Sequence, residues 1–267
     1  MPLQLTPTLR DVLRATPRPL AGIWVCSGSP LVAEIVAGSG IDWLLIDQEH
    51  GPNDLQTVLA QLQAVAAYPA TPVVRVPSGD VVTIKQVLDL GAQNILVPMV
   101  SSAEQARELV RAVRYPPRGL RGVGSALARS ARWNRVEDYL LDADRHVSLF
   151  VQVETVEGIE AAGQIAGTDG IDGVFVGPSD LAASMGLLGQ QAHPDVVSAV
   201  TRAFEAVRTA GKPVGVNAFD PVVARAYYDA GADFVLVGAD VALLARGTEA
   251  LAARFGEASD TTRRPSY

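Results

Sequence analysis

Acidic residues follow apolar segments at two places in this sequence. Glu154 comes directly after a run rich in β-branched residues, and Asp180 closely follows the next such run. If the two runs are neighbouring strands of a parallel sheet, both carboxylates lie at one edge and can converge on one ion. Two carboxylates without a thiolate suit a hard cation such as Mg²⁺ or Mn²⁺. The alternative is that each acid caps the helix that follows it.

A second polar group follows two other apolar runs. Asp47, Glu49 and His50 come after one run, and Arg75 ends the next. His50 is the only one of three histidines in such a position, which favours proton transfer over a structural role. Arg75 begins in apolar surroundings and therefore needs an anionic partner. We favour a substrate carboxylate or enolate as that partner; Asp47 or Glu49 is the alternative.

Lysine and cysteine narrow the chemistry further. The only lysines, Lys85 and Lys212, do not follow apolar runs as the acids do. A lysine Schiff base is therefore disfavoured, and a carbanion would need a metal as its electron sink. Cys26 is the only cysteine, which rules out a thiolate metal cluster, and we interpret it as a small buried apolar residue.

The elements that must position these residues form a regular alternation. Eight short apolar runs, each typical of a strand covered on both faces, alternate with longer helical patterns. A chain of 267 residues with this alternation predicts an α/β fold, a (β/α)₈ TIM barrel, over residues 1–257, with a polar tail over 258–267. A doubly wound open sheet is the alternative, but residues 26–30 lack its glycine-rich phosphate loop. The predicted strands are residues 20–26, 43–46, 72–76, 94–98, 147–153, 173–176, 213–216 and 233–237.

Three local patterns stand out beside the alternation. Asn53 is expected to cap a helix running toward Ala66, and Ser102 with Gln105 resembles a capping box. Residues 114–135 contain six arginines and interrupt the βα rhythm. Either solvated charge with subunit contacts or contact with substrate would explain this arginine-rich segment.

Composition sets the class of protein. Hydrophobic residues make up 48% of the chain, enough for a sizeable core. The formal net charge of −7 argues against nucleic acid as a partner. No apolar run reaches the length of a signal peptide or a membrane span. We therefore expect a soluble cytoplasmic enzyme with no membrane partner.

Seven short motifs contain or flank these residues. They are Gly22–Trp24, Leu45–Gly51, Val74–Pro77, Gly91–Met99, Arg121–Gly124, Gln152–Thr155 and Val176–Leu181. Taken in order, they resemble the HpcH/HpaI aldolase family over roughly residues 8–255. Within that family, the chain looks like the metal-dependent class II pyruvate aldolases that act on 2-keto-3-deoxy sugar acids and 4-hydroxy-2-oxo acids.

The resemblance implies a TIM barrel whose C-terminal helix is swapped between subunits of a hexamer, a trimer of dimers. It implies pyruvate and a small aldehyde as reactants, with Glu154 and Asp180 holding Mg²⁺, Mn²⁺ or Co²⁺. His50 would transfer protons with Asp89 as its paired acid, and Arg75 would stand beside the keto oxygen. Trp24 and Gln152 would line the substrate pocket, and the backbone at Pro178 and Ser179 would contact the pyruvate carboxylate. Asp47 and Glu49 would support the residues that contact the substrate.

Some positions depart from the family pattern. Gly51 stands where relatives often carry alanine, and Cys26, Ser27 and Asn217–Phe219 vary among relatives. These positions shape the aldehyde side, so the natural acceptor stays open. A CoA-ester lyase or 2-oxo acid decarboxylase of the same superfamily is an alternative function, as is a barrel that binds a sugar acid without turnover.

Overall fold

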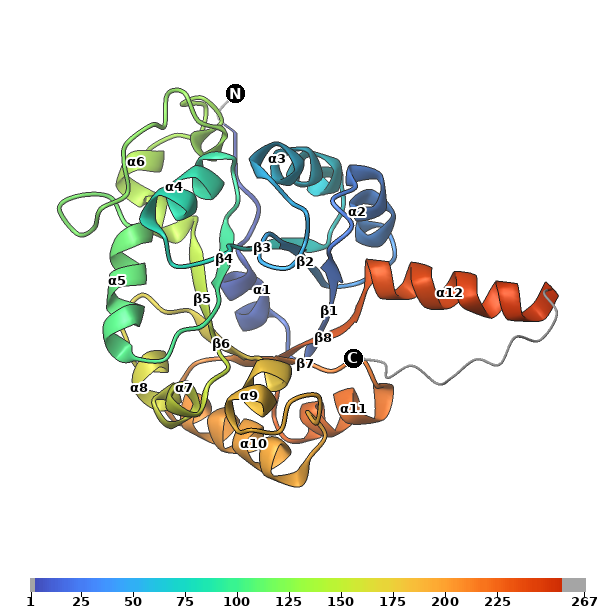
Figure 1. The fold of residues 1–267 in the computed structure, drawn as a ribbon. Coiled ribbons are helices and arrows are strands. Elements are labelled where there is room, and N and C mark those ends of the chain that lie inside the picture. Colours follow the sequence, from blue (N-terminus) through green and yellow to red (C-terminus); the bar gives the residue numbers. More distant parts are fainter. Residues whose placement is uncertain (1–2, 256–267) are drawn as a thin grey trace.

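The computed structural model describes residues 3–255, which form a closed barrel of eight parallel strands in sequence order (Figure 1). The predicted TIM barrel is confirmed, and each predicted strand matches an observed one to within a residue or two. The predicted tail, residues 258–267, lies outside the described residues. The strands are β1 (Leu20–Val25), β2 (Trp43–Asp47), β3 (Thr71–Arg75), β4 (Asn94–Val97), β5 (Ser148–Val153), β6 (Gly173–Val176), β7 (Val214–Asn217) and β8 (Phe234–Ala239).

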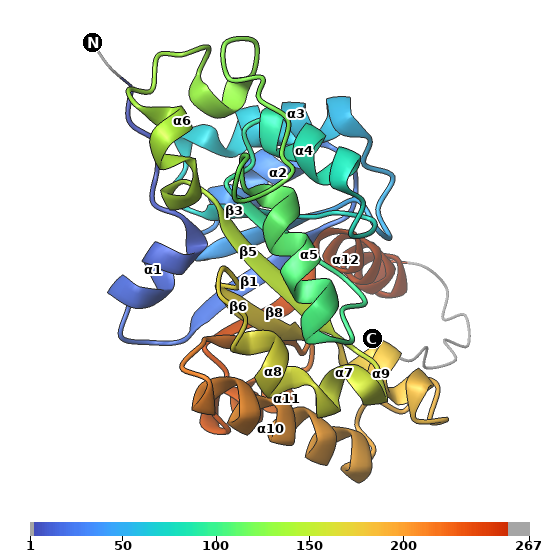
Figure 2. The ribbon, with the colours of Figure 1, turned by 90° about the vertical axis from the view of Figure 1, so that its left-hand side faces the viewer.

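Helices surround the barrel, and the last one projects away from it (Figures 1 and 2). No helix within residues 3–255 combines the length and the apolar character needed to cross a membrane. The helices are α1 (Leu9–Ala15), α2 (Pro30–Ala37), α3 (Leu55–Ala64), α4 (Val81–Asp89), α5 (Ala103–Val113), α6 (Tyr139–Asp142), α7 (Val156–Glu160), α8 (Ala162–Ala166), α9 (Pro178–Ser184), α10 (Pro194–Thr209), α11 (Pro221–Asp229) and α12 (Asp240–Phe255), with short 3₁₀ turns η1 (Val65–Ala67), η2 (Arg129–Ala131) and η3 (Ala143–Arg145).

Aromatic side chains fill the inside of the barrel. The ring centroids of Trp43 and Phe150 lie 5.6 and 5.5 Å from that of Phe234. Glycines make room for these rings, because a Cβ at Gly22 would overlap the Trp43 ring and one at Gly215 would overlap Phe234. The barrel is therefore a packed core rather than a pore, and a ligand can enter only from its ends.

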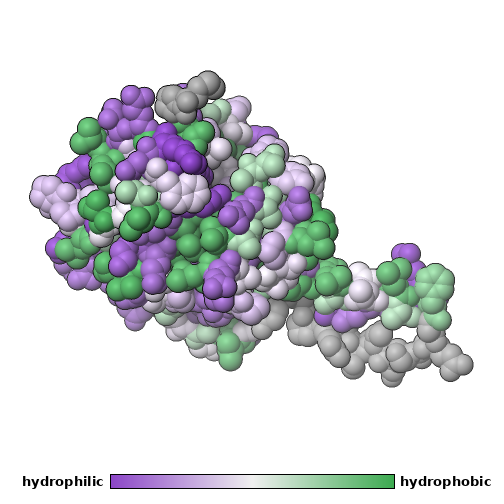
Figure 3. All heavy atoms as spheres, turned by 90° about the horizontal axis from the view of Figure 1, so that it is seen from above, coloured by the Kyte–Doolittle hydropathy of each residue, from purple (hydrophilic) through white to green (hydrophobic). Residues whose placement is uncertain are grey.

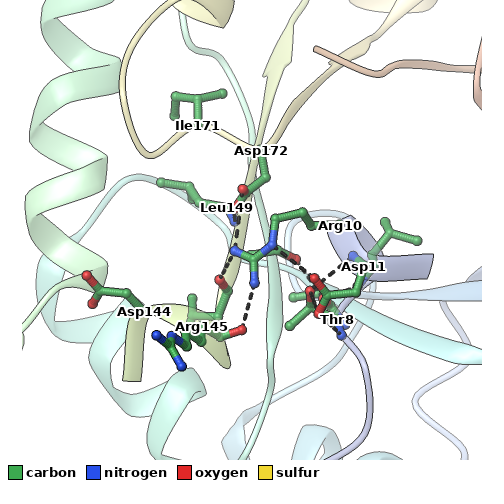
Figure 4. A network of polar contacts seen from close by, with 12 residues as sticks. Thr8, Arg10, Asp11, Asp144, Arg145, Leu149, Ile171 and Asp172 are labelled. Atoms are coloured by element: carbon green, nitrogen blue, oxygen red, sulfur yellow. Dashed lines mark hydrogen bonds and ion pairs between the residues drawn. The ribbon is translucent and has the colours of Figure 1, made fainter. Parts of the chain in front are cut away.

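Helix α1 closes the N-terminal end of the barrel. Its buried Leu9 donates its backbone N–H to Asn94 Oδ1 on β4 at 2.7 Å. Arg10 donates to the carbonyls of Arg145 and Val147 and lies 3.5 Å from the Asp172 carboxylate (Figure 4). This polar network stabilises the N-terminal end and leaves the opposite end for chemistry.

One predicted detail of the βα connections is wrong. Asp54, not Asn53, caps α3, with its Oδ1 accepting from the Thr57 N–H at 2.8 Å. Asn53 is buried, and its Nδ2 donates to the carbonyl of Asp47 at 2.6 Å. The prediction for Asn53 was wrong because asparagine suits both a helix cap and a loop-bracing role, and only burial distinguishes them.

The arginine-rich segment, residues 114–135, is partly built into the core. Arg121 is fully buried, and its guanidinium lies 4.6 Å from the centroid of the Tyr115 ring. Arg129 donates to the carbonyl of Leu90 at 3.0 Å. Solvated charge therefore does not explain Arg121, whose buried guanidinium is compensated by the Tyr115 ring and by Asp89, 3.6 Å from its Nη2.

Gly215→Ala is expected to destabilise the protein by about 1–3 kcal/mol, since the added methyl group would overpack the barrel against Phe234. Chemical denaturation measures the change in the free energy of unfolding. Gly238→Ala in β8 is the matched control, because its Cβ would meet no atom closer than Ile23 Cδ1 at 4.0 Å. Equal stability of the two variants would contradict the packing described for the barrel interior.

Candidate active site

A buried arginine ties together the C-terminal ends of β2 and β3. Arg75 pairs in register with Asp47, and its Nε and Nη2 donate to the two Asp47 carboxylate oxygens at 2.8 and 2.7 Å. Its Nη1 lies 2.7 Å from Glu49 Oε2. The sequence left a substrate group or these two acids as the partner, and within the chain the acids are the partners. Each terminal nitrogen of Arg75 keeps a second N–H for a ligand.

The other contacts of Arg75 come from the mouth of the barrel. Trp24 on β1 is buried and stacks on the guanidinium, with 4.2 Å from Arg75 Cζ to the ring centroid. The His50 side chain is 67% exposed, and its Nε2 lies 4.0 Å from Glu49 Oε2. Burial raises the pKa of Glu49, and the nearby Arg75 charge opposes that rise. The structure thus brings together four predicted residues around Arg75: Trp24, Asp47, Glu49 and His50.

Glu154 lies in a second, negatively charged part of the mouth. Its side chain is buried, Oε1 accepts from the Met99 N–H at 2.8 Å, and Oε2 accepts from Gln152 Nε2. Burial raises the Glu154 pKa to about 7, and the carboxylates of Asp180 and Glu49 act in the same direction. No salt bridge joins Glu154 to a cationic side chain of residues 3–255. A buried carboxylate needs a positively charged partner, and a bound cation could supply it.

Asp180 stands in the first turn of α9 and is exposed, next to the buried Pro178 and the half-buried Ser179. Gly177 lets this turn approach Glu154, because a Cβ there would lie 2.5 Å from Glu154 Oε2. Neither acid acts as a side-chain N-cap: Thr155 caps α7, and α9 has no side-chain cap. The helix-cap alternative is therefore wrong for both acids.

The donor atoms around Glu154 and Asp180 fit a hard divalent metal. Both residues offer carboxylate oxygens, and Gln152 Oε1 is buried with no hydrogen-bond partner in the structure. Oxygen ligands of this kind suit Mg²⁺ or Mn²⁺, which keep waters in their coordination sphere. Within residues 3–255 no group of three histidine, cysteine or acidic side chains could hold a metal. The candidate ligands are therefore the carboxylates of Glu154 and Asp180 and the Oε1 atom of Gln152.

Asp89 lies apart from these residues within one chain. It is the last residue of α4, a helix that leads away from the end of β3, and its Oδ1 lies 3.6 Å from Arg121 Nη2. Burial raises the pKa of Asp89, against the opposing effect of Arg121. The structure does not bring Asp89 to His50 of the same chain, so the predicted pair stays a prediction.

Both lysines lie away from the mouth. Lys212 precedes β7 at the N-terminal end, where its Nζ donates to the carbonyl of Ile171 at 2.6 Å. Lys85 lies in the middle of α4, and its Cδ is 3.2 Å from where a Cβ of Gly122 would lie. Neither amine is placed to form a Schiff base beside Arg75 or Glu154.

Gly51, one of the departures from the family pattern, has a steric cause. A Cβ at this position would lie 2.5 Å from the carbonyl oxygen of Asp47 and 2.8 Å from Asn53 Nδ2. The loop after β2 closes too tightly here for alanine. The burial of Asn53 and the glycine at position 51 therefore belong to the same local structure.

Sequence reasoning missed two contributors to the mouth. Asp240 follows β8 and is buried, and the rule that found the other acids at strand ends would have found it too. Met99 contributes its backbone N–H to Glu154 from a left-handed conformation, with φ of +59°. No sequence pattern marks that role, because methionine rarely adopts this conformation.

Comparison with known proteins agrees with this geometry. The family model for HpcH/HpaI aldolase/citrate lyase matches residues 20–246. A Salmonella arizonae protein named 4-hydroxy-2-oxo-heptane-1,7-dioate aldolase is 54% identical over 247 residues, 92% of this chain and 94% of that protein.

Solved structures show the same likeness. A Burkholderia cenocepacia protein of the HpcH/HpaI aldolase/citrate lyase family superposes with a TM-score of 0.90 at 42% identity, covering 94% of this chain and 100% of that one. The citrate synthase SbnG superposes with a TM-score of 0.82 at 30% identity, covering 92% and 96%. Sequence and structure agree across almost the whole described chain: it belongs to the HpcH/HpaI aldolase/citrate lyase family.

Proposed function

We propose that this protein is a metal-dependent pyruvate aldolase, a carbon–carbon lyase that reversibly cleaves a 4-hydroxy-2-oxo acid or a 2-keto-3-deoxy sugar acid into pyruvate and an aldehyde. The observation that carries the proposal is the buried Glu154 carboxylate, which has acidic neighbours and lies in the same barrel mouth as Arg75. The relatives named 4-hydroxy-2-oxo-heptane-1,7-dioate aldolase support it and suggest that dioate as the first substrate to try.

Glu154 and Asp180 would hold the metal, with the free Gln152 Oε1 beside them. When bound, the metal supplies positive charge at the keto oxygen, where negative charge develops as an enolate forms. Glu154 is suited to this because hydrogen bonds from Met99 and Gln152 already fix its carboxylate, which therefore needs no reorganisation when the metal binds.

Arg75 would orient the pyruvate end and stabilise the enolate. Asp47 grips its guanidinium in a bidentate pair, Glu49 holds Nη1, and Trp24 covers its face. A guanidinium held this way keeps its remaining N–H groups aimed at one place, which is worth most when charge builds up there. The backbone of the first turn of α9, at Ser179, would meet the pyruvate carboxylate.

His50 would move the proton at the C4 oxygen of the substrate. Its exposed ring stands on the loop after β2, beside Glu49, whose carboxylate also contacts Arg75. In the cleavage direction His50 would accept the proton of the C4 hydroxyl as the C3–C4 bond breaks. In the reverse direction, aldol addition, it would return that proton to the C4 alkoxide. The paired acid Asp89 would have to come from a second copy, because Asp89 of the same chain lies beside Arg121.

The form of α12 supports assembly through this helix. Its only buried residue is Asp240, while Leu243, Leu244 and Phe255 are 62%, 66% and 89% exposed. Figure 3 shows hydrophobic atoms on the arm that projects from the barrel. Exposed apolar surface of this kind marks an interface. We therefore propose that α12 packs on a second chain, in a hexamer built as a trimer of dimers.

Metal removal tests the proposal. Protein treated with EDTA is expected to lose pyruvate release from 4-hydroxy-2-oxo-heptane-1,7-dioate and to regain it with Mg²⁺, Mn²⁺ or Co²⁺, because the charge at the keto oxygen is lost and restored. Coupled reduction of the released pyruvate measures the rate. Full activity without metal, or a borohydride-stable adduct on the chain, would contradict it. Cleavage of a CoA ester instead would favour the alternative lyase.

Arg75→Lys is expected to lower kcat by about 10²-fold, because an ammonium cannot keep both the bidentate pair with Asp47 and a contact to the enolate. Steady-state kinetics measures kcat, and the Mn²⁺ affinity and melting temperature show that the fold and metal site persist. Arg18→Lys, at an exposed arginine paired with Asp42, is the matched control and should keep full activity. A normal kcat in Arg75→Lys would remove Arg75 from the reaction.

Mixing two inactive variants tests the shared site. His50→Ala and Asp89→Asn should each lose activity, by about 10²-fold or more for His50. If each site takes Asp89 from a second chain, co-refolded mixtures should recover up to about a quarter of wild-type activity. Leu244→Asp, which places a charge on the apolar face of α12, should reduce the assembled mass in analytical ultracentrifugation. No recovery in mixtures of the first two variants would mean that Asp89 acts within its own chain or only structurally.

A further inference from the structure

Asp240 joins the last strand of the barrel to the projecting helix. It is the first residue of α12, is 5% exposed, and its Oδ1 accepts from the Val241 N–H at 2.7 Å. The same oxygen accepts from the Cys26 N–H at 2.9 Å, and Oδ2 accepts from the Ser27 N–H at 3.0 Å. One buried carboxylate therefore holds two consecutive amides of the loop between β1 and α2.

That loop, residues 26–29, also touches the catalytic residues on its other side. The thiol of Cys26 lies 3.8 Å from Oδ2 of Asp47, the acid that grips Arg75. A Cβ at Gly51 would lie 3.2 Å from the carbonyl oxygen of Cys26, so the loop after β1 packs against the loop that carries His50. A shift of residues 26–29 would therefore be felt at His50.

The position of the loop around the barrel assigns it to one side of the substrate. In the closed order β1 to β8, strand β1 stands opposite β5, which ends next to Glu154. The pyruvate end of the substrate belongs at Glu154 and Asp180, and the C4 oxygen belongs at His50. The part of the substrate beyond C4 then extends toward the loop between β1 and α2.

We propose that Asp240 is a positioning residue that fixes the β1–α2 loop as the acceptor side of the active site. The inference rests on the proposed aldolase function and adds a residue that determines how the aldehyde portion is held. Without the carboxylate, the amides of Cys26 and Ser27 lose their acceptor, and the loop is released from the start of α12. Glu154 and Asp180 lie across the barrel and Asp47 keeps its bidentate pair with Arg75, so pyruvate binding and enolisation would change much less than binding of the aldehyde portion.

Two reactions of one enzyme separate these roles. Exchange of the pyruvate methyl protons in D₂O, followed by NMR with Mg²⁺, reports enolisation without any aldehyde. Cleavage of 4-hydroxy-2-oxo-heptane-1,7-dioate needs both sides of the site. In Asp240→Ala we expect exchange within about twofold of wild type and a fall of about tenfold or more in kcat/KM for cleavage, carried by KM. Asp240→Asn keeps one acceptor oxygen and should lie between.

Asp195→Asn, at an exposed acid in the first turn of α10, is the control and should change neither reaction. An equal loss of exchange and cleavage in Asp240→Asn would show that Asp240 only maintains the fold or the pyruvate side, and would overturn the proposal. Wild-type rates of both reactions in Asp240→Ala would overturn it too. If wild-type protein with Mg²⁺ shows no exchange at all, the aldolase function itself fails, which is a different outcome.

Discussion

The buried carboxylate of Glu154 is the constraint on which the rest of the mouth depends. An ionised group taken out of water needs compensating charge or hydrogen bonds. Met99 and Gln152 each supply one N–H group, while Asp180 and Glu49 add like charge. Met99 adopts a left-handed conformation that costs about 1–2 kcal/mol, so the fold accepts strain to aim one amide at this acid. These hydrogen bonds leave the charge uncompensated, which is why we propose that a cation binds there.

Arg75, at the end of β3, shows the opposite arrangement of charges from Glu154, which follows β5. Arg75 is a buried cation with two acids and an aromatic ring around it, so its charge is satisfied before any ligand arrives. Breaking such a buried pair costs about 3–5 kcal/mol, which keeps the guanidinium in place. A fixed cation and a cluster of carboxylates at one barrel mouth are the features on which the proposed site for a small oxo acid rests. In the proposed reaction, these fixed groups would stabilise the negative charge that develops on the enolate more than any charge on the bound substrate.

The barrel could be predicted well from the sequence, because strands covered on both faces must be continuously apolar and each is followed by a helical pattern. The rule that catalysis belongs to strand ends selects Glu154, Asp180, His50 and Arg75 as candidates from the order of residues alone, and the structure places all four at the C-terminal ends of strands or in the segments that follow them. It could not show that Asp47 and Glu49 satisfy Arg75, because partner choice depends on side-chain direction at neighbouring strand ends. Asn53 was misassigned, and the left-handed Met99 was not foreseen, because both depend on how loops close in space.

Asp89 and α12 show a different limit. Asp89 lies beside Arg121 rather than beside His50, and α12 exposes apolar residues; the proposed second chain would account for both. A single chain describes the barrel fully, but it cannot show which surfaces meet in an assembly. The proposed metal site at Glu154 and Asp180, which pyruvate would reach directly, can be tested by electron paramagnetic resonance of added Mn²⁺. We expect one site per chain, a spectrum that changes on adding pyruvate, and loss of the site in Glu154→Gln. Unchanged Mn²⁺ binding in Glu154→Gln, or none in the wild type, would contradict it.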